Sequence, residues 1–471
     1  MNRANVQGLV LAPYKYRRAR HLLFTLPPGP ENGRALLREL LPKITHGASD
    51  VSGVSPWLCN IGITCEGLRR LQCDAALLAN LDEAFQAGPD PVSLSDIAGS
   101  ESDRANWWDG QWQTRQIHLL VQIYTREGDQ ESEAESSELT KATNLVLAAA
   151  AAAGWQELLP RKTPDHNKSL RLNGAALPRD PLDVGKGAKV HFGYRDGLSQ
   201  PEIDWDVDLP GDPLDPLGLP NPLNRSNFLL GYNRTEPPAV SEFFRDSSYL
   251  VLRWLQQDVA AFENFLTAAA PALSPDRPLA EGREFVAAKL MGRWRDGTPL
   301  TLSPDQPNPS LNTTPFDFQK QDADGSRCPF GAHIRVVNPR DQPLSHIKGV
   351  PRVIRRGMPY GPEMPKWTGG PTPDDGIERG IVGAFLCTNI AQQIYTLTQW
   401  ISRTNFSDVF SPGHLHDQDS LFGNRKVPRA GTKWNMPSPG GALPSLPDFV
   451  RTRGTAFFML PSMKALQELA K

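Results

Sequence analysis

The sequence predicts an α+β fold in which helices pack on antiparallel β-sheet, and three observations support this. The chain has 471 residues, more than one hydrophobic core usually supports, so two domains are expected. Strand-like and helix-like patterns follow one another in the same order in both halves. A segment rich in proline and glycine, Leu209–Pro222, separates the halves. We therefore expect one domain over residues 1–225 and a second over 226–471.

The first half contains two strand–helix pairs. His21–Leu26 has the apolar character of a short strand, and Glu31–Leu41 has apolar residues at helical spacing. Ile117–Tyr124 predicts a second strand. The alanine-rich segment Ser136–Ala153 then predicts a helix that ends at Gly154, a residue that readily takes the left-handed conformation found after helices.

The second half begins with the same order of elements. Ser248–Leu255 predicts a strand and Asp258–Leu266 the helix that follows it. The later elements expected in this half are a strand-like run at His333–Val337, a strand at Ile381–Cys387, a helix over Ala391–Arg403 and a last strand at Thr455–Leu460.

Composition and charge exclude several classes of protein. The formal net charge is −2 and no long basic run occurs, which argues against nucleic-acid or electrostatic membrane binding. No apolar stretch reaches the length needed to span a bilayer, and the N-terminus lacks the apolar run of a signal peptide. The five cysteines form no C-x-x-C pair, so neither a disulfide framework nor a zinc site is indicated. We expect a cytoplasmic protein.

The most informative segment is Val190–Pro201, V-H-F-G-Y-R-D-G-L-S-Q-P. It holds Asp196 between Gly193 and Gly197, which allow a tight turn and a close approach of the backbone to a bound group. A carboxylate presented in this way can take up and return a proton in front of a flat cofactor. Glycine-bracketed aspartates are also common in ordinary turns, so the motif alone does not identify a site.

A second segment, Arg327–Arg340, reads R-C-P-F-G-A-H-I-R-V-V-N-P-R and contains His333 at the start of an apolar run. One interpretation is a hydrogen-bonded core histidine, the commoner fate of a single buried imidazole. The other is an axial ligand to haem iron, which needs one rigidly held histidine whose second nitrogen is engaged. A single ligand leaves no spacing pattern that separates the two.

A third segment, Pro351–Gly361, contains the adjacent residues Arg355 and Arg356 on a predicted strand. Their side chains should point to opposite faces, so at most one of them can face a buried site. An arginine beside a catalytic acid would keep that acid ionised and stabilise developing negative charge. Two surface arginines paired with nearby acids are an equally good interpretation of the segment alone.

Together these segments resemble the dye-decolorizing peroxidase family. G-Y-R-D-G at Gly193–Gly197, C-P-F-G-A-H-I-R at Cys328–Arg335 and V-I-R-R-G-M-P-Y at Val353–Tyr360 occur in the family's order and approximate spacing. Further similarities are N-V-Q-G-L-V-L near the start, G-R-W-R-D-G-T-P-L at Gly292–Leu300 and F-F-M-L-P-S at Phe457–Ser462. The resemblance covers essentially the whole chain and is nearest to the longer bacterial or fungal-like branch.

The resemblance implies two ferredoxin-like domains that enclose one haem b per chain. It implies His333 as the axial iron ligand, and Asp196 and Arg355 on the opposite side of the haem, with Gly193 and Gly197 close to the cofactor. It also implies reduction of hydrogen peroxide and oxidation of bulky aromatic molecules such as anthraquinone and azo dyes and phenols. A haem-binding or haem-trafficking protein of the same fold is the alternative, although a carrier needs only His333.

Three further residues follow from the resemblance. A carboxylate should accept the other imidazole N–H of His333, and D-S-L-F-G in His414–Gly423 looks like a variant of the family's segment, with Asp419 as first choice and Asp417 as second. Tyr360 and Trp400 stand where the family is thought to pass electrons through surface aromatics. The helical spacing of Trp400 with apolar neighbours is equally typical of core packing. The sequence does not indicate the oligomeric state or the physiological reductant.

Overall fold

The computed structural model describes most of the chain. The described residues are 1–26, 29–49, 55–90, 93–94, 104–126, 137–178, 188–206, 223–233, 236–313, 315–342, 350–403, 418–425, 434 and 436–471. The proline-rich segment Leu209–Pro222 and the second-choice carboxylate Asp417 lie outside them.

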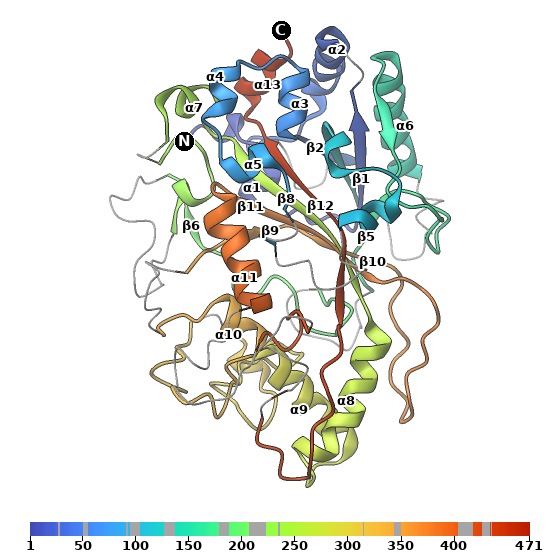
Figure 1. Ribbon diagram of the computed structural model, residues 1–471, viewed down its shortest axis with the longest axis vertical. Helices are drawn as coiled ribbons and strands as arrows, with labels where there is room; N and C mark the ends of the chain where they lie inside the picture. The colour runs from blue at the N-terminus through green and yellow to red at the C-terminus, as the bar shows by residue number, and fades with distance from the viewer. Residues whose placement is uncertain are drawn as a thin grey trace.

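One large sheet runs through the described part of the chain (Figure 1). Its strand order is β10-β11-β8-β12-β2-β3-β1-β4, with β5 also paired to β1 and β9 to β11. Every pair in this sheet is antiparallel, which confirms the predicted α+β class. The strands are β1 (Arg18–Thr25), β2 (Trp57–Ile63), β3 (Leu119–Thr125), β4 (Gln156–Leu158), β5 (Leu172–Ala175), β8 (Ser248–Gln257), β9 (Ile354–Arg355), β10 (Met358–Tyr360), β11 (Gly380–Cys387) and β12 (Val450–Leu460). A separate parallel pair joins β6 (Ile203–Asp204) to β7 (Leu223–Asn224).

The two halves of the sequence contribute separate sets of strands. Strands β4, β1, β3 and β2 come from the first half, and β12, β8, β11 and β10 from the second. The sets are joined where β12 pairs with β2 at Met459 and Ile63. The repeated order of elements therefore corresponds to two strand sets side by side, while the boundary at residue 225 stays a prediction.

The helices gather in different places around the sheet (Figure 1). Helices α2, α3, α6 and α13 lie near the strands of the first half, and α8 and α9 form a pair at the opposite end of the molecule. The helices are α1 (Gly8–Leu11), α2 (Pro30–Leu40), α3 (Cys65–Arg70), α4 (Ala75–Ala79), α5 (Glu83–Ala87), α6 (Ser137–Ala152), α7 (Pro238–Phe243), α8 (Val259–Leu273), α9 (Leu279–Met291), α10 (His333–Val337), α11 (Thr396–Arg403) and α13 (Met463–Leu469). A π-helix, η7 (Ile390–Tyr395), leads directly into α11.

The central strands are buried on both faces, which explains their continuous apolar sequences. All seven residues of β3 are buried, and so are Ser248–Trp254 in β8. Local signals set the ends of the helices that follow: the Asp258 carboxylate accepts the backbone N–H of Ala261 at 2.8 Å and caps α8. After α6, Gly154 has φ +73°, the left-handed conformation expected there.

The predicted strand-like run at His333–Val337 is wrong, because these residues form the short helix α10. Apolar runs of this length do not separate strand from helix by their pattern alone. In the structure no strand pairs with this segment, and Ala332 begins the helical turn from an extended conformation. His333 is therefore the first residue of a helix.

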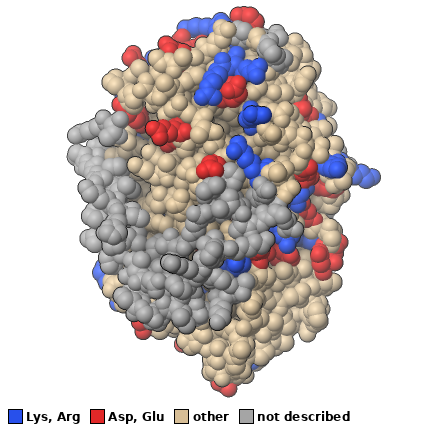
Figure 2. All heavy atoms as spheres, in the orientation of Figure 1, with Lys and Arg blue, Asp and Glu red and all other residues tan. Residues whose placement is uncertain are grey.

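Within the described residues, no helix is both long enough and apolar enough to cross a membrane. On the face shown in Figure 2, acidic and basic side chains are interspersed over the described surface. This distribution agrees with the near-zero net charge of the whole chain.

Candidate functional site

A cavity of about 660 Å³ lies between the sheet of the second half and the helices α10 and α11. It falls within the size range of small-molecule and cofactor sites. Strands β8, β9, β11 and β12 form one wall, and the segment that carries Asp196 closes another part. Among the residues that line it are Asp196, Gly197, Arg293, His333, Arg340, Arg352, Arg355, Phe385, Phe422 and Asp448. The structure thus brings Asp196, His333 and Arg355, which are far apart in the sequence, to one cavity.

Asp196 lies on a tight loop and its side chain is exposed. The loop is held by an antiparallel bridge between Lys189 and Arg195 and by the N–H of Asp196, which donates to Ala188 O at 2.8 Å. One carboxylate oxygen accepts the N–H of Gly197 at 2.7 Å. The carboxylate is therefore oriented by its own loop at the wall of the cavity.

The two glycines of this motif have different roles. Gly197 has φ +81° and nothing within 4 Å of where a Cβ would stand, so the left-handed backbone itself requires glycine. Gly193 also has a positive φ, but a Cβ there would come within 3.0 Å of the Arg295 side chain. Gly193 does not line the cavity. Its close neighbour in the structure is a side chain of the protein, and its approach to a bound group stays a prediction.

Arg355, the last residue of β9, lines the cavity, and Arg356, the residue after the strand, does not. Nη2 of Arg355 donates to Leu198 O at 2.5 Å, which ties the guanidinium to the loop two residues after Asp196. Arg356 instead donates through Nε to Leu9 O at 2.9 Å. Of these two adjacent arginines, only Arg355 can act on a group bound in the cavity.

His333 is held by a buried carboxylate. Its Nδ1 lies 2.7 Å from Oδ2 of Asp419, so Nδ1–H donates to the carboxylate and Nε2 is left for a ligand. Asp419 is fully buried, and its other oxygen accepts the N–H groups of Leu421 and Phe422 at 2.9 Å each. Asp419 therefore belongs to the interior of the protein and not to a surface loop.

The loop that carries Asp419 is attached directly to the turn before His333. The backbone N–H and the hydroxyl of Ser420 both donate to Gly331 O, at 2.8 and 3.0 Å. Arg425 donates to the carbonyls of Asp419 and Ser420 at 2.9 and 2.6 Å. These contacts hold the two chain segments together, and they involve neither the Asp419 carboxylate nor the His333 imidazole.

We expect Asp419→Ala to lower the free energy of unfolding by about 2–3 kcal/mol, because it leaves two backbone N–H groups and the imidazole N–H without their buried acceptor. Urea denaturation measures the change. Asp419→Asn keeps one acceptor oxygen and should lose less. Equal stability of Asp419→Ala and the parent protein would contradict the contacts described.

A group of four arginines in the cavity escaped the sequence analysis as a group. Arg293, Arg340, Arg352 and Arg355 line the cavity, and among the described residues none of them forms an ion pair with a carboxylate. We call these four residues the arginine cluster. Arg293 lies within Gly292–Leu300, a segment whose resemblance to the family is visible in the sequence, and that was the available signal.

Within the arginine cluster Arg293 and Arg340 are buried, Arg352 and Arg355 are half-buried, and their like charges repel one another. Burial, and then the charges of Arg293 and Arg352, lower the pKa of Arg340 to about 9. Burial also lowers the pKa of Arg293 and of Arg352 to about 10, with a contribution from Arg355 in both. Nε of Arg340 has no hydrogen-bond partner among the described residues. Buried cations without counter-ions indicate a site for an anionic group.

The two aromatic residues expected at the surface are buried. Tyr360 is 4% exposed and Trp400 is 5% exposed, so the prediction that they are surface aromatics is wrong. The phenol of Tyr360 donates to Glu378 at 2.9 Å, and Trp400 packs with Val336 and Val350. For Trp400 the helical spacing with apolar neighbours indicated this packing.

The cavity is not lined by a cluster of metal-binding side chains from the described residues. Among the residues that the structure describes, no group of three or more His, Cys, Asp or Glu side chains could hold a metal ion by itself. A single oriented imidazole therefore faces the cavity, with an aspartate and an arginine on other walls.

No family model matches the chain. Curated relatives do: a dye-decolorizing peroxidase of Mycetinis scorodonius is 31% identical over 325 residues, which are 63% of this chain and 59% of the relative. One of Mycena epipterygia is 31% identical over 335 residues, 64% of this chain and 60% of the relative. The chain thus spans about three fifths of these relatives. One of Exidia glandulosa is 25% identical over 99% of this chain and 86% of the relative.

Solved structures agree over the full length. A dye-decolorizing peroxidase in complex with 2,6-dimethoxyphenol has a TM-score of 0.76 at 25% identity, with 100% of both chains covered. The fold is also that of the enzyme of Auricularia auricula-judae, at a TM-score of 0.76 and 21% identity. The chain is therefore similar in sequence to dye-decolorizing peroxidases of fungal and bacterial origin, and it has their fold.

Proposed function

We propose that the protein is a haem-dependent peroxidase that reduces hydrogen peroxide and oxidises bulky aromatic molecules such as dyes and phenols. The observation that carries the proposal is the meeting of Asp196, Arg355 and His333 at one cavity. A haem carrier needs only the axial histidine, whereas this cavity also holds an acid and an arginine suited to peroxide chemistry.

The residues of the cavity fit haem b. His333 offers Nε2 as the iron ligand because Asp419 holds Nδ1. Within the arginine cluster, Arg293, Arg340 and Arg352 offer cations to the two carboxylates of the porphyrin, and the Nε of Arg340 has no hydrogen-bond partner among the described residues. Phe385 and Phe422 offer apolar surface to the ring. We infer one haem per chain, with Gly197 allowing the Asp196 loop to approach it.

When bound, haem supplies the two electrons that break the O–O bond of peroxide. Asp196 takes a proton from hydrogen peroxide and returns it to the departing water, as a general base and then a general acid. Arg355 stabilises the negative charge that develops on the oxygen during this step, since its guanidinium is held to the same loop by Leu198. Aromatic donors then restore the resting enzyme one electron at a time.

Two measurements test the proposal. The purified full chain, supplied with haem, should show a Soret band, and rapid mixing with hydrogen peroxide should change that band within seconds and support repeated oxidation of an anthraquinone dye. A Soret band without turnover would favour the haem carrier. No Soret band after loading would exclude both.

Replacement of Arg340 in the arginine cluster should lower haem affinity and raise the stability of the haem-free protein. Arg340→Met should lower haem affinity at least ~10-fold, because a charged donor to a carboxylate is lost. It should raise the free energy of unfolding of the haem-free protein by about 1 kcal/mol, because a buried cation without a counter-ion is removed. Haem titration and urea denaturation measure the two.

The gain in stability should depend on pH. Burial lowers the pKa of Arg340 to about 9 in the folded protein, whereas in the unfolded chain the pKa returns to its much higher usual value, so above pH 9 the unfolded chain binds more protons. The buried cation therefore destabilises the folded protein fully below pH 9 and less above it. The difference in free energy of unfolding between Arg340→Met and the parent should shrink above pH 9 as well. Lower stability of the haem-free variant at pH 7 would contradict this account.

A further inference from the structure

Helix α10 cannot hold His333 in place by itself. It has only five residues, His333–Val337, and isolated helices of this length are not stable in water. Asp419 contacts the imidazole but not the helix backbone. Other contacts must therefore fix the helix that carries the proposed iron ligand.

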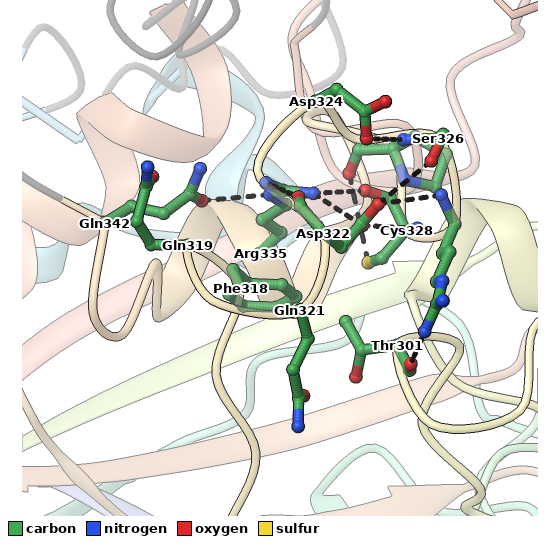
Figure 3. A network of polar contacts seen from close by, with 12 residues as sticks. Thr301, Phe318, Gln319, Gln321, Asp322, Asp324, Ser326, Cys328, Arg335 and Gln342 are labelled. Atoms are coloured by element: carbon green, nitrogen blue, oxygen red, sulfur yellow. Dashed lines mark hydrogen bonds and ion pairs between the residues drawn. The ribbon is translucent and has the colours of Figure 1, made fainter.

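Those contacts come from Arg335, which lies two residues after His333 in the same helix and is 1% exposed (Figure 3). Its Nη1 donates to Oδ2 of Asp322 at 2.9 Å and to Cys328 O at 2.5 Å. Its Nη2 donates to Asp322 O at 2.8 Å, and its Nε to Oε1 of Gln342 at 2.9 Å. Every nitrogen of the guanidinium therefore has an acceptor.

The carboxylate of Asp322 extends this network to the residues before His333. It is fully buried and accepts the backbone N–H of Arg327 at 2.9 Å and of Cys328 at 2.8 Å. Cys328 leads through the turn at Pro329–Gly331 into α10. One ion pair thus binds the chain on both sides of His333, five residues before it and two residues after it.

Aromatic rings fix the orientation of the guanidinium. Its central carbon lies 4.7 Å from the ring centre of Phe318 and 4.4 Å from that of Phe330. Planar stacking combined with a forked donor is a geometry that lysine does not reproduce. A fully buried ion pair is weak support for stability, because desolvation offsets much of its attraction, so a role in specifying one geometry is the better account.

We propose that Arg335 is a positioning residue for the iron ligand: through Asp322 and Cys328 it sets the position of α10 and thereby the direction of the His333 imidazole. The claim that Arg335 directs the imidazole toward iron rests on the proposed haem function. The claim that Arg335 holds α10 in place does not depend on haem, so each claim can be tested and rejected on its own.

The test compares Arg335→Met with Arg379→Met. Arg379 is 3% exposed, pairs with both oxygens of Asp375 at 2.7 Å and donates to the carbonyls of Pro362 and Ile377, but it does not line the cavity. Arg379 is therefore a matched control: its replacement removes a buried guanidinium with a similar set of hydrogen bonds at a place outside the cavity. Arg335→Lys and Gln342→Leu are milder variants for use if Arg335→Met does not fold.

Two readouts are used, neither of them turnover. In the haem-free full chain, hydrogen exchange of amides in residues 329–338 should accelerate at least ~10-fold in Arg335→Met and ~2- to 3-fold in Gln342→Leu, and stay unchanged in Arg379→Met. In the haem-loaded chain, the electron paramagnetic resonance spectrum of the ferric iron should broaden or split in Arg335→Met and be unchanged in Arg379→Met. Arg335→Lys should lie between the parent and Arg335→Met in both.

The outcomes are distinguishable. Equal exchange and equal spectra in Arg335→Met and Arg379→Met would overturn the proposal, since Arg335 would then be a structural residue like any other. Faster exchange with an unaltered iron spectrum would overturn the effect on the ligand. Failure of every variant to bind haem would contradict the proposed function, while the exchange data would still decide whether Arg335 holds the helix.

Discussion

Asp196→Asn should lower the second-order rate of reaction with hydrogen peroxide by about 10²–10⁴-fold, the usual contribution of a positioned general acid–base. The amide keeps an oxygen that can accept the Gly197 N–H at the same place, so the loop should not move. What it loses is the capacity to take up a proton from peroxide. Stopped-flow measurement of the Soret change at several peroxide concentrations gives this rate directly, and the haem content of the variant should equal that of the parent.

Asp448 provides a matched control for this prediction. It is the other aspartate that lines the cavity, and it is exposed like Asp196. Both variants remove one negative charge from the cavity, so a general effect of charge on the rate would appear in both. Because Asp448 is not assigned to proton transfer, Asp448→Asn should leave the rate within about twofold of the parent. If only Asp448→Asn slowed the reaction, the assignment of proton transfer to Asp196 would be wrong.

Arg355→Leu separates proton transfer from charge stabilisation. It keeps Asp196 and removes the guanidinium that Leu198 holds beside it, so the rate should fall by about 10–10²-fold. Undiminished rates in both Asp196→Asn and Arg355→Leu would disprove the assignment of this side of the cavity.

The fold could be predicted to a large extent because its strands are buried on both faces. Continuous apolar sequences such as Ser248–Leu255 identify such strands, and capping residues such as Asp258 identify the helix that follows. The short segment His333–Val337 was misjudged because its structure depends on distant partners. Asp322 and Gln342 hold it through Arg335, and no local pattern encodes those contacts.

The candidate site could be predicted only in part for a similar reason. The motif around Asp196 is local, since the glycine at 197 is needed by the backbone conformation itself. The arginine cluster is not local: Arg293 and Arg340 come from separate segments and become a cationic site only when the fold places them together. Burial of Tyr360 and Trp400 is likewise a property of the packed structure.

His333→Ala should have the largest effect on haem binding, because His333 is the one residue whose free imidazole nitrogen we assign to the iron. We expect haem affinity to fall at least ~100-fold, consistent with the loss of an axial ligand, and the Soret band of any haem that still binds to shift. The arginine cluster should retain part of the affinity, since its interaction with the porphyrin carboxylates does not involve the iron.

Added imidazole should restore the parent's Soret position in His333→Ala, because removal of the side chain leaves room beside the Asp419 carboxylate, which then accepts the N–H of the added ring. The matched control is His21→Gln: His21 is buried, and burial lowers its pKa to about 4, but it does not line the cavity. That variant should keep the parent spectrum. An unchanged spectrum and affinity in His333→Ala would mean that iron takes its axial ligand from another residue, and the pairing of His333 with Asp419 would then serve the protein core alone.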